Sequence, residues 1–266
     1  MQRSVGSWMD AEVTSRSDVT LSVAVAGGAA IASETLSVTL DEVELPVREL
    51  VDAHGVRLHH IAEVGPGRLA VRYEATVDGR IEPGPATELD LIASTRPTRY
   101  CESDLLGPFA RDQFVETTPA GLVDEVTTWV HEHVAYISGS SRPTDGAVTT
   151  LLRREGVCRD FAHLVIALLR SRDVPARFVS VYAPGLSPMD FHAVVEAHVD
   201  GRWVVADATG LAPRLAMVRI ATGGDAADTA FLTTTGDPVN MGGLEVGAVV
   251  EGELPVDDHH QVVQLG

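Results

Sequence analysis

The sequence predicts an α+β protein in which an all-β segment precedes a core of helices and antiparallel strands. Up to about residue 95, short runs rich in Val and Leu alternate with polar residues between Gly and Pro turn signals. From Pro119 onward, apolar residues recur at helical spacing instead. A long apolar stretch over residues 158–170 then precedes several strand patterns. This change of period is typical of two structural units that follow each other along the chain.

Residues 1–95 are expected to form a sandwich-like β domain. Residues 36–40 and 69–77 show the alternation of a half-buried strand, and Gly65-Pro-Gly67 and Asp78-Gly79 are turn signals beside them. A small sandwich fits the spacing of these strands. Prolines at positions 83, 85 and 97 indicate a stiff connection, so residues 96–117 are expected to be a linker.

Residues 118–250 are expected to form the second unit, the core. Pro119 suits the first turn of a helix, and residues 158–170 are apolar on nearly every side, as in a helix at the centre of a domain. Strands are predicted at 177–182, 191–199 and 202–209, with Asp200-Gly201 as a type I′ turn between the last two. Further strands at 230–234 and 244–250 are expected to complete the core. Residues 251–266 form a tail, whose polar stretch 257–260 is expected to fray.

The charge balance limits the functions that the chain can have. The net charge is −18, and all 20 basic residues are arginine. A lysine-free chain has no Schiff-base lysine, no pyridoxal-phosphate lysine and no Walker P-loop. Its negative charge makes nucleic acid an unfavourable partner, because phosphates are repelled. We expect neither a cofactor nor a metal.

The apolar segments do not indicate export or membrane insertion. Residues 21–32 are the longest apolar run near the start, but acidic residues precede them, whereas a signal peptide has a basic region there. No run reaches the roughly 20 apolar residues of a membrane span. We therefore expect a cytoplasmic protein without a membrane partner. The two cysteines, Cys101 and Cys158, are expected to be a buried thiol and a free thiol.

Cys158, His192 and Asp207 are the candidate catalytic residues. Cys158 opens the buried helix, where the helix dipole and the free backbone N–H groups favour thiolate over thiol. Arg154 and Arg159 add positive charge to this segment. Histidine supplies a base, and a carboxylate can orient it. The single asparagine, Asn240, is near the C-terminus, so Asp207 is the expected orienting residue.

The predicted hairpin brings the histidine and the aspartate together. A two-residue turn at 200–201 pairs residue 199 with 202, and by extension residue 194 with Asp207 and His192 with Thr209. His192 and Asp207 are then diagonal neighbours on one face of the sheet, with backbones roughly 7–8 Å apart. An imidazole–carboxylate hydrogen bond is within reach at that spacing. A cysteine, a histidine and an aspartate so placed predict nucleophilic acyl chemistry.

Three segments carry a resemblance to a known family. They are Gly156-Val-Cys-Arg-Asp-Phe-Ala-His163, Asp190-Phe-His192 and Trp203-Val-Val-Ala-Asp-Ala-Thr209. Together they resemble the core motifs of the transglutaminase-like superfamily, in particular a bacterial subgroup with an N-terminal β-domain. The resemblance implies a papain-like core, with Cys158 as nucleophile, His192 as base and Asp207 as orienting acid. It also implies a peptide or protein amide substrate.

The reaction itself stays open at this stage. Members of the superfamily hydrolyse amides or transfer the acyl group to an amine. Val194 and Ala206 replace larger aromatic residues that the family often has, which favours an open groove and hence hydrolysis by a peptidase or amidase. Amine transfer is the alternative, and a catalytically silent binding module or a partner-docking subunit is a further one. Gln113 and Tyr136 are candidates for a second oxyanion donor, and the oligomeric state is undetermined.

Overall fold

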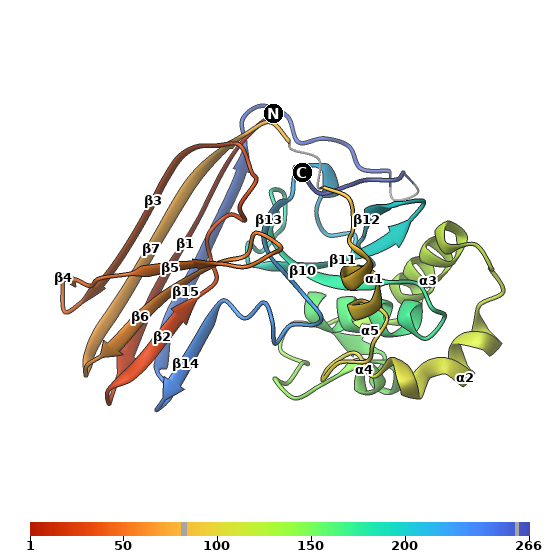
Figure 1. Cartoon of the computed structure of the whole chain (residues 1–266), viewed down its shortest axis with the longest axis horizontal. Coiled ribbons are helices and arrows are strands. Elements are labelled where there is room, and N and C mark those ends of the chain that lie inside the picture. Colours follow the sequence, from red (N-terminus) through yellow and green to blue (C-terminus); the bar gives the residue numbers. More distant parts are fainter. Residues whose placement is uncertain (81–83, 259–260) are drawn as a thin grey trace.

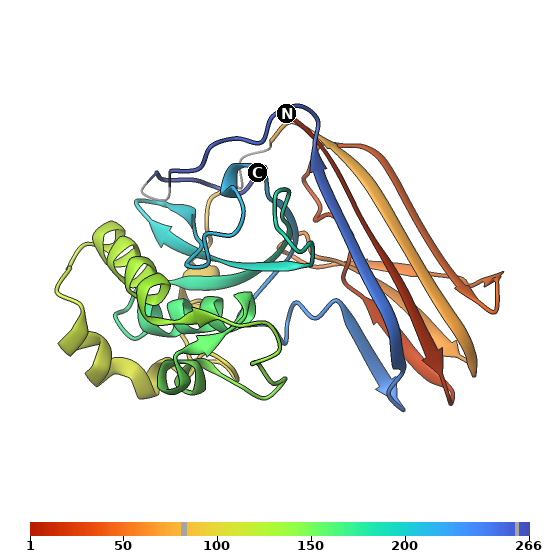
Figure 2. The same cartoon turned by 180° about the vertical axis from the view of Figure 1, so that it is seen from behind.

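The structure is a computed structural model, and it describes residues 1–80, 84–258 and 261–266. A β-sandwich forms one end of the molecule and a group of helices forms the other (Figure 1). A four-stranded antiparallel sheet lies between them, as the view from behind also shows (Figure 2). The predicted α+β architecture, with a sandwich-like β part and a cysteine-bearing helix packed on an antiparallel sheet, is confirmed.

The sandwich consists of two antiparallel sheets. The strand order of the five-stranded sheet is β15-β1-β7-β3-β4, and that of the four-stranded sheet is β14-β2-β6-β5. The strands of the first are β1 (Gln2–Val13), β3 (Ile31–Leu40), β4 (Val43–Glu44), β7 (Gly67–Asp78) and β15 (Asn240–Val250). Those of the second are β2 (Ser17–Leu21), β5 (Arg48–Val51), β6 (Arg57–Val64) and β14 (Leu232–Gly236). Alternate residues of both sheets, such as Val19 and Val71, share one apolar core.

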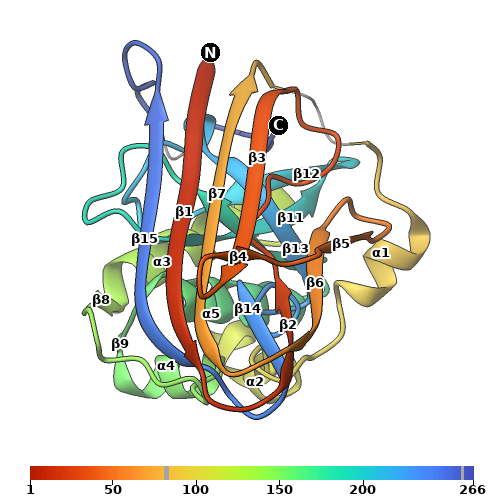
Figure 3. The ribbon, with the colours of Figure 1, turned by 90° about the vertical axis from the view of Figure 1, so that its left-hand side faces the viewer.

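Two strands that we expected in the core belong to the sandwich, and that expectation was wrong. β14 pairs with β2, and β15 pairs with β1 along ten residues (Figure 3). Gly6 lies opposite Gly247, and both leave room for the ring of Trp8, which would come within 3.2 Å of a Cβ at either position. Alternation predicts that a segment is a strand, but which edge it joins depends on edges left free by distant parts of the chain.

The helical side contains five helices among the described residues, of which α5 is the central one. They are α1 (Glu88–Ala93), α2 (Ser103–Gln113), α3 (Pro119–His133), α4 (Ala147–Arg153) and α5 (Cys158–Arg170). From Asp160 onward every residue of α5 is buried, as its uniform apolarity predicted. No helix of the described residues is long and apolar enough to cross a membrane.

The core sheet has the strand order β12-β11-β10-β13. Its strands are β10 (Ala176–Tyr182), β11 (His192–Val199), β12 (Arg202–Ala206) and β13 (Val218–Gly223). Two short strands, β8 (Ala135–Tyr136) and β9 (Glu155–Gly156), pair with each other outside this sheet. A 3-10 turn spans Arg214–Ala216. One face packs on α5 through Val195 and Ala197, while Tyr182 and Ile220 join the core of the sandwich. The sequence prediction missed β13, although Val218 and Ile220 alternate with polar residues as a strand does.

The predicted hairpin has the predicted register. Val199 pairs with Arg202, and both turn residues have positive φ, 49° at Asp200 and 82° at Gly201. Positive φ at both central positions is the requirement of a type I′ turn. This register fixes which side chains of β11 and β12 share a face.

The expected linker, residues 96–117, is integrated into the core. It contains α2, whose Leu106 and Ala110 join Cys101 and Phe114 in the apolar cluster around α5. The buried Arg170 guanidinium donates to carbonyl oxygens of Arg96, Ala176 and Gly224, which joins this segment to the sheet. Pro97 predicted a stiff connection, but the apolar residues that follow it bury themselves against α5.

The tail is also held, and the expectation that it frays was wrong for Asp257. The Asp257 carboxylate accepts from the Arg214 guanidinium at 2.9 Å, and both side chains are buried. Farther on, the Val263 carbonyl accepts from Val205 N–H, and Leu265 is buried. His259 and His260 lie outside the described residues. The polar run 257–260 was predicted to be solvent-exposed because Arg214, the partner of Asp257, is distant in the sequence.

Candidate active site

His192 and Asp207 meet at one end of the core sheet. His192 begins β11, and Asp207 directly follows β12. The His192 Nε2 lies 3.1 Å from Asp207 Oδ2, and both side chains are almost completely buried. The diagonal relation inferred from the hairpin is therefore present. A buried imidazole–carboxylate pair of this kind holds the ring in one orientation.

Thr209 donates two hydrogen bonds to the Asp207 carboxylate, and the sequence prediction gave it no role. Its hydroxyl donates to Asp207 Oδ1 at 2.7 Å, and its backbone N–H donates to the same oxygen at 2.9 Å. Burial alone would raise the pKa of Asp207, but His192 and the Thr209 donors lower it below its ordinary value. The signal that could have identified Thr209 is its position two residues after the aspartate, opposite His192 in the predicted ladder.

The imidazole of His192 is biased toward its charged form. Burial opposes the charge, but Asp207 and the neighbouring Cys158 thiol raise the pKa of His192 to about 10. Its Nδ1 is buried and makes no hydrogen bond with the residues that the structure describes. One ring nitrogen is thus held by the carboxylate, while the other remains available to the thiol.

Cys158 is the first residue of α5, at the position that the sequence predicted. The strand β9 leads into it, and Val157 N–H donates to the Asp160 carboxylate at 2.8 Å, which fixes the first turn of the helix. Its side chain is half-buried and unpaired with Cys101, since both cysteines are free. A thiol at a helix N-terminus lies where the dipole stabilises negative charge.

The two arginines near Cys158 have defined partners. The Arg159 guanidinium donates to Ser141 Oγ at 2.6 Å and to the Arg142 carbonyl, so it anchors the loop that follows β8. The Arg154 guanidinium lies 4.5 Å from the ring centroid of Trp129 on α3. Both guanidinium groups therefore make packing contacts, and they also place positive charge in the segment around the N-terminus of α5.

Tyr136 lies against Cys158. Burial, then the charge and side-chain hydrogen bond of Cys158, raise the pKa of Tyr136 to about 12, while the Cys158 backbone N–H acts in the opposite direction. Tyr136 also pairs with Gly156 across β8 and β9. Gln113, the other candidate donor, is an exposed residue at the end of α2, and no contact with Cys158 is found for it among the described residues. The structure therefore favours Tyr136 over Gln113.

The exposed residues next to Cys158 include both apolar and acidic side chains. Tyr136 and Ile137 are each nearly half exposed, and Asp190 lies close enough to Tyr136 to raise its pKa. Val194 and Ala206, in contrast, are buried in the sheet. Ala206 also lines a cavity of about 260 Å³ beside α3, next to Asp207, whereas Val194 packs in an apolar cluster of the sheet. The size of these two side chains alone gives no reason to prefer hydrolysis.

A family model matches this part of the chain. The model of the transglutaminase-like superfamily covers residues 109–208, a range that includes Cys158, His192 and Asp207. Two uncharacterized mycobacterial proteins match shorter segments, one from Mycobacterium leprae with 36% identity over 91 residues and one from Mycobacterium tuberculosis with 35% over 81 residues. These segments cover 33% and 30% of this chain, but only 31% and 26% of the relatives. The chain thus spans less than a third of the length of the curated relatives it matches.

A solved structure resembles the whole chain. It comes from Cytophaga hutchinsonii and is described as a "putative cysteine protease". Its TM-score with this chain is 0.89 at 31% sequence identity, and the alignment covers 100% of this chain and 98% of that one. The likeness includes the sandwich as well as the core.

Proposed function

This chain belongs to the transglutaminase-like superfamily, and from that premise we propose that it is a cysteine-dependent enzyme that hydrolyses peptide or protein amides through a Cys158 thioester. The observation that carries the proposal is the 3.1 Å contact between His192 and Asp207 beside Cys158. Under this proposal Cys158 is the nucleophile, His192 the general base and acid, and Asp207 the orienting residue.

The first half of the reaction forms the thioester. His192 Nδ1 takes the thiol proton, and Cys158 Sγ attacks the amide carbonyl carbon. The oxygen of the tetrahedral intermediate accepts hydrogen bonds from the Cys158 backbone N–H and the Tyr136 hydroxyl. The C–N bond then breaks, and His192 gives its proton to the leaving amine. The acyl group remains on Sγ.

The second half releases the acid. His192 deprotonates a water molecule, which attacks the thioester carbonyl; the C–S bond breaks, and the proton returns to the thiolate. Asp207 stays ionised throughout and holds the imidazole, consistent with the lowered pKa of its carboxyl group. The protein supplies all of these groups from its own side chains and backbone.

Hydrolysis and amine transfer differ only in the second acceptor. The name of the Cytophaga hutchinsonii protein supports hydrolysis, because it is similar to this chain over its whole length. Transfer to a primary amine is the alternative within the same mechanism. A silent binding module is less favoured, since Cys158, His192 and Asp207 are all present and adjacent. A cytoplasmic location is also part of the proposal.

Mass spectrometry of a peptide digest incubated with the protein, with and without methylamine, tests the proposal. Hydrolysis yields new termini or deamidated glutamine, whereas transfer yields products heavier by the amine. We expect hydrolysis products from the wild type and none from Cys158→Ala or His192→Ala, with a smaller loss in Asp207→Ala. Equal product from Cys158→Ala and the wild type would exclude the mechanism. Unchanged peptides with every variant would support a binding module.

A further inference from the structure

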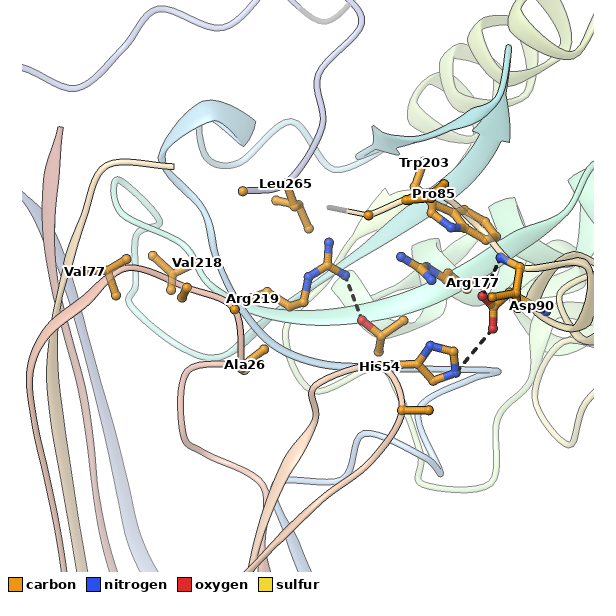
Figure 4. Close-up of a pocket in the computed structure, with 18 residues that line it drawn as sticks. Ala26, His54, Val77, Pro85, Asp90, Arg177, Trp203, Val218, Arg219 and Leu265 are labelled. Atoms are coloured by element: carbon orange, nitrogen blue, oxygen red, sulfur yellow. Dashed lines mark hydrogen bonds and ion pairs between the residues drawn. The ribbon is translucent and has the colours of Figure 1, made fainter. Parts of the chain in front are cut away.

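A cavity of about 450 Å³ lies between the sandwich and the core sheet. Loops of the sandwich around Gly27 and His54 form one side, and residues of β10, β12 and β13 form the other (Figure 4). Cys158, His192 and Asp207 are not among the described residues that line it. The cavity is therefore separate from the candidate active site, and nothing in the proposed reaction uses it.

Two guanidinium groups share a single buried carboxylate at this cavity. Glu196 on β11 is completely buried, with Oε2 2.7 Å from Arg177 Nη2 and Oε1 2.6 Å from Arg219 Nη2. Both arginines line the cavity and keep 12% and 16% of their side chains exposed, and Figure 4 shows their guanidinium groups directed into the same space. One negative charge thus faces two positive charges. The wall formed by these three residues carries one excess positive charge next to the cavity.

The two arginines also retain unused hydrogen-bond donors. Arg177 donates to Glu196 through Nε and Nη2, and Arg219 donates through Nη1 and Nη2. Among the described residues, no partner is found for Arg177 Nη1 or Arg219 Nε. The Arg177 guanidinium lies 4.0 Å from the ring centroid of Trp203, which holds its plane in place. Burial lowers the pKa of Arg177, and the Arg219 charge acts in the same direction, while Glu196 and Asp90 act against both.

Asp90 of α1, which Figure 4 shows beside Arg177, is a carboxylate that other groups already engage. Asp90 accepts from the Thr87 N–H at 2.9 Å and lies 3.8 Å from His54 Nε2. Burial would raise the pKa of Asp90, but the Thr87 hydrogen bonds and the charges of His54 and Arg177 lower it below its ordinary value. Asp90 therefore offsets part of the arginine charge at a distance, but it does not occupy the donors of Arg177 and Arg219. Small apolar residues such as Ala53 and Val218 line the remaining space.

We propose that this cavity binds a small organic anion, a carboxylate or a phosphate monoester, whose charged group is held by Arg177 and Arg219. Guanidinium groups recognise both kinds of anion with paired hydrogen bonds, and a pre-oriented pair loses little freedom on binding. The volume leaves room for an apolar ring beside the anionic group. The bound anion accepts hydrogen bonds from the guanidinium donors that Glu196 and Asp90 leave free.

Isothermal titration of the full chain at low ionic strength tests this with three probes: benzoate, phenyl phosphate and the neutral isostere benzamide. We expect one or both anions to bind, and benzamide to bind at least about tenfold more weakly. Added salt should weaken the binding of the anions. The stronger of the two anions distinguishes a carboxylate site from a phosphate-ester site.

Two variants locate the binding. Arg219→Gln removes one donor group, and Ala53→Trp adds a large side chain on the sandwich side of the cavity while leaving the hydrogen bonds of Glu196 unchanged; each should weaken anion binding by about tenfold or more. Arg68→Gln is the matched control, because Arg68 is exposed on the sandwich and pairs with Asp10 at 3.5 Å. If Arg219→Gln does not fold, Ala53→Trp decides alone. Benzamide binding as tightly as benzoate, unaltered anion binding in Ala53→Trp, or no binding of either anion would overturn the proposal.

Discussion

His192 Nε2 lies 3.1 Å from Asp207 Oδ2 although the ladder between β11 and β12 ends at Val195 and Ala206, before either residue is reached. The two side chains meet beyond the last paired residues, on the face that the register of the hairpin assigns to both. Their contact is buried, so the imidazole is held by a carboxylate that water does not screen. The other ring nitrogen, Nδ1, is left for Cys158.

The two cysteines should react very differently with iodoacetamide. Cys158 is half-buried at the mouth of the site, whereas Cys101 is completely buried and burial raises the pKa of its thiol to about 12. We expect native protein to take up one equivalent, on Cys158, and unfolded protein to take up two, read by intact mass. At pH 6, His192→Ala should slow labelling by on the order of tenfold or more, because the imidazolium no longer stabilises the thiolate. An unchanged rate in that variant would contradict the thiolate–imidazolium pair.

Stability should fall in the alkaline range because of His192. Its folded pKa is about 10, against an ordinary value of 6.5, so the folded state binds this proton more tightly than the unfolded chain does. The contribution is complete below pH 6.5 and is lost as pH rises through about 10, with a slope of up to about 1.4 kcal/mol per pH unit. Urea unfolding at pH 7 to 10 measures it, and few other groups titrate there in a chain without lysine. Parallel curves for the wild type and His192→Gln would refute this contribution.

Thr209 should act as a positioning residue. Thr209→Val removes a donor from Asp207, and since a hydrogen bond to a charged group contributes about 1.5–3 kcal/mol, kcat should fall roughly tenfold to a hundredfold. The acid limb of the kcat–pH profile should move to higher pH, because the carboxylate loses a group that keeps its pKa low. Thr209→Ser should restore both values. A loss of activity without a shift of the profile, or without rescue by serine, points to a packing role instead.

Tyr136 should matter far more for turnover than for alkylation. If its hydroxyl donates to the oxyanion, Tyr136→Phe lowers kcat by on the order of a hundredfold. Alkylation of Cys158 by iodoacetamide forms no tetrahedral intermediate, so its rate should fall far less than kcat, only by the effect of losing the hydrogen bond between Tyr136 and the Cys158 side chain. Gln113→Ala is the control variant and should keep full turnover. Parallel losses of turnover and alkylation in Tyr136→Phe would mean that the tyrosine supports the thiol and not the oxyanion.

Local sequence was sufficient for the elements that carry the candidate site. Period and composition predicted the buried helix over 158–170, and the Asp200-Gly201 turn fixed the register that places His192 and Asp207 on one face. The contribution of Thr209 followed from the same register but was overlooked. The contact of Tyr136 with Cys158 did not follow, because it depends on how β8 and β9 come together.

Longer-range arrangements could not be predicted in the same way. The strands after residue 230 were recognised but assigned to the core, although β15 pairs with β1 at the other end of the chain. Segment 96–117 was taken as a linker because the prolines at positions 83, 85 and 97 are visible in the sequence, whereas the surface that buries α2 is not. The tail was expected to fray because Arg214, its partner, lies more than forty residues away from Asp257.

By itself, then, the sequence determined the order of β and helical units, the helix that begins at Cys158, and the hairpin that carries its two partners. These depend on backbone preferences and side-chain periods within a few residues of each other. Only the tertiary structure decided which edges β14 and β15 join, how the tail is held, and that Arg177 and Arg219 converge on Glu196 beside a cavity. Such contacts depend on which edges, charges and apolar faces remain unpaired once the other segments have packed, and no local stretch of sequence contains that information.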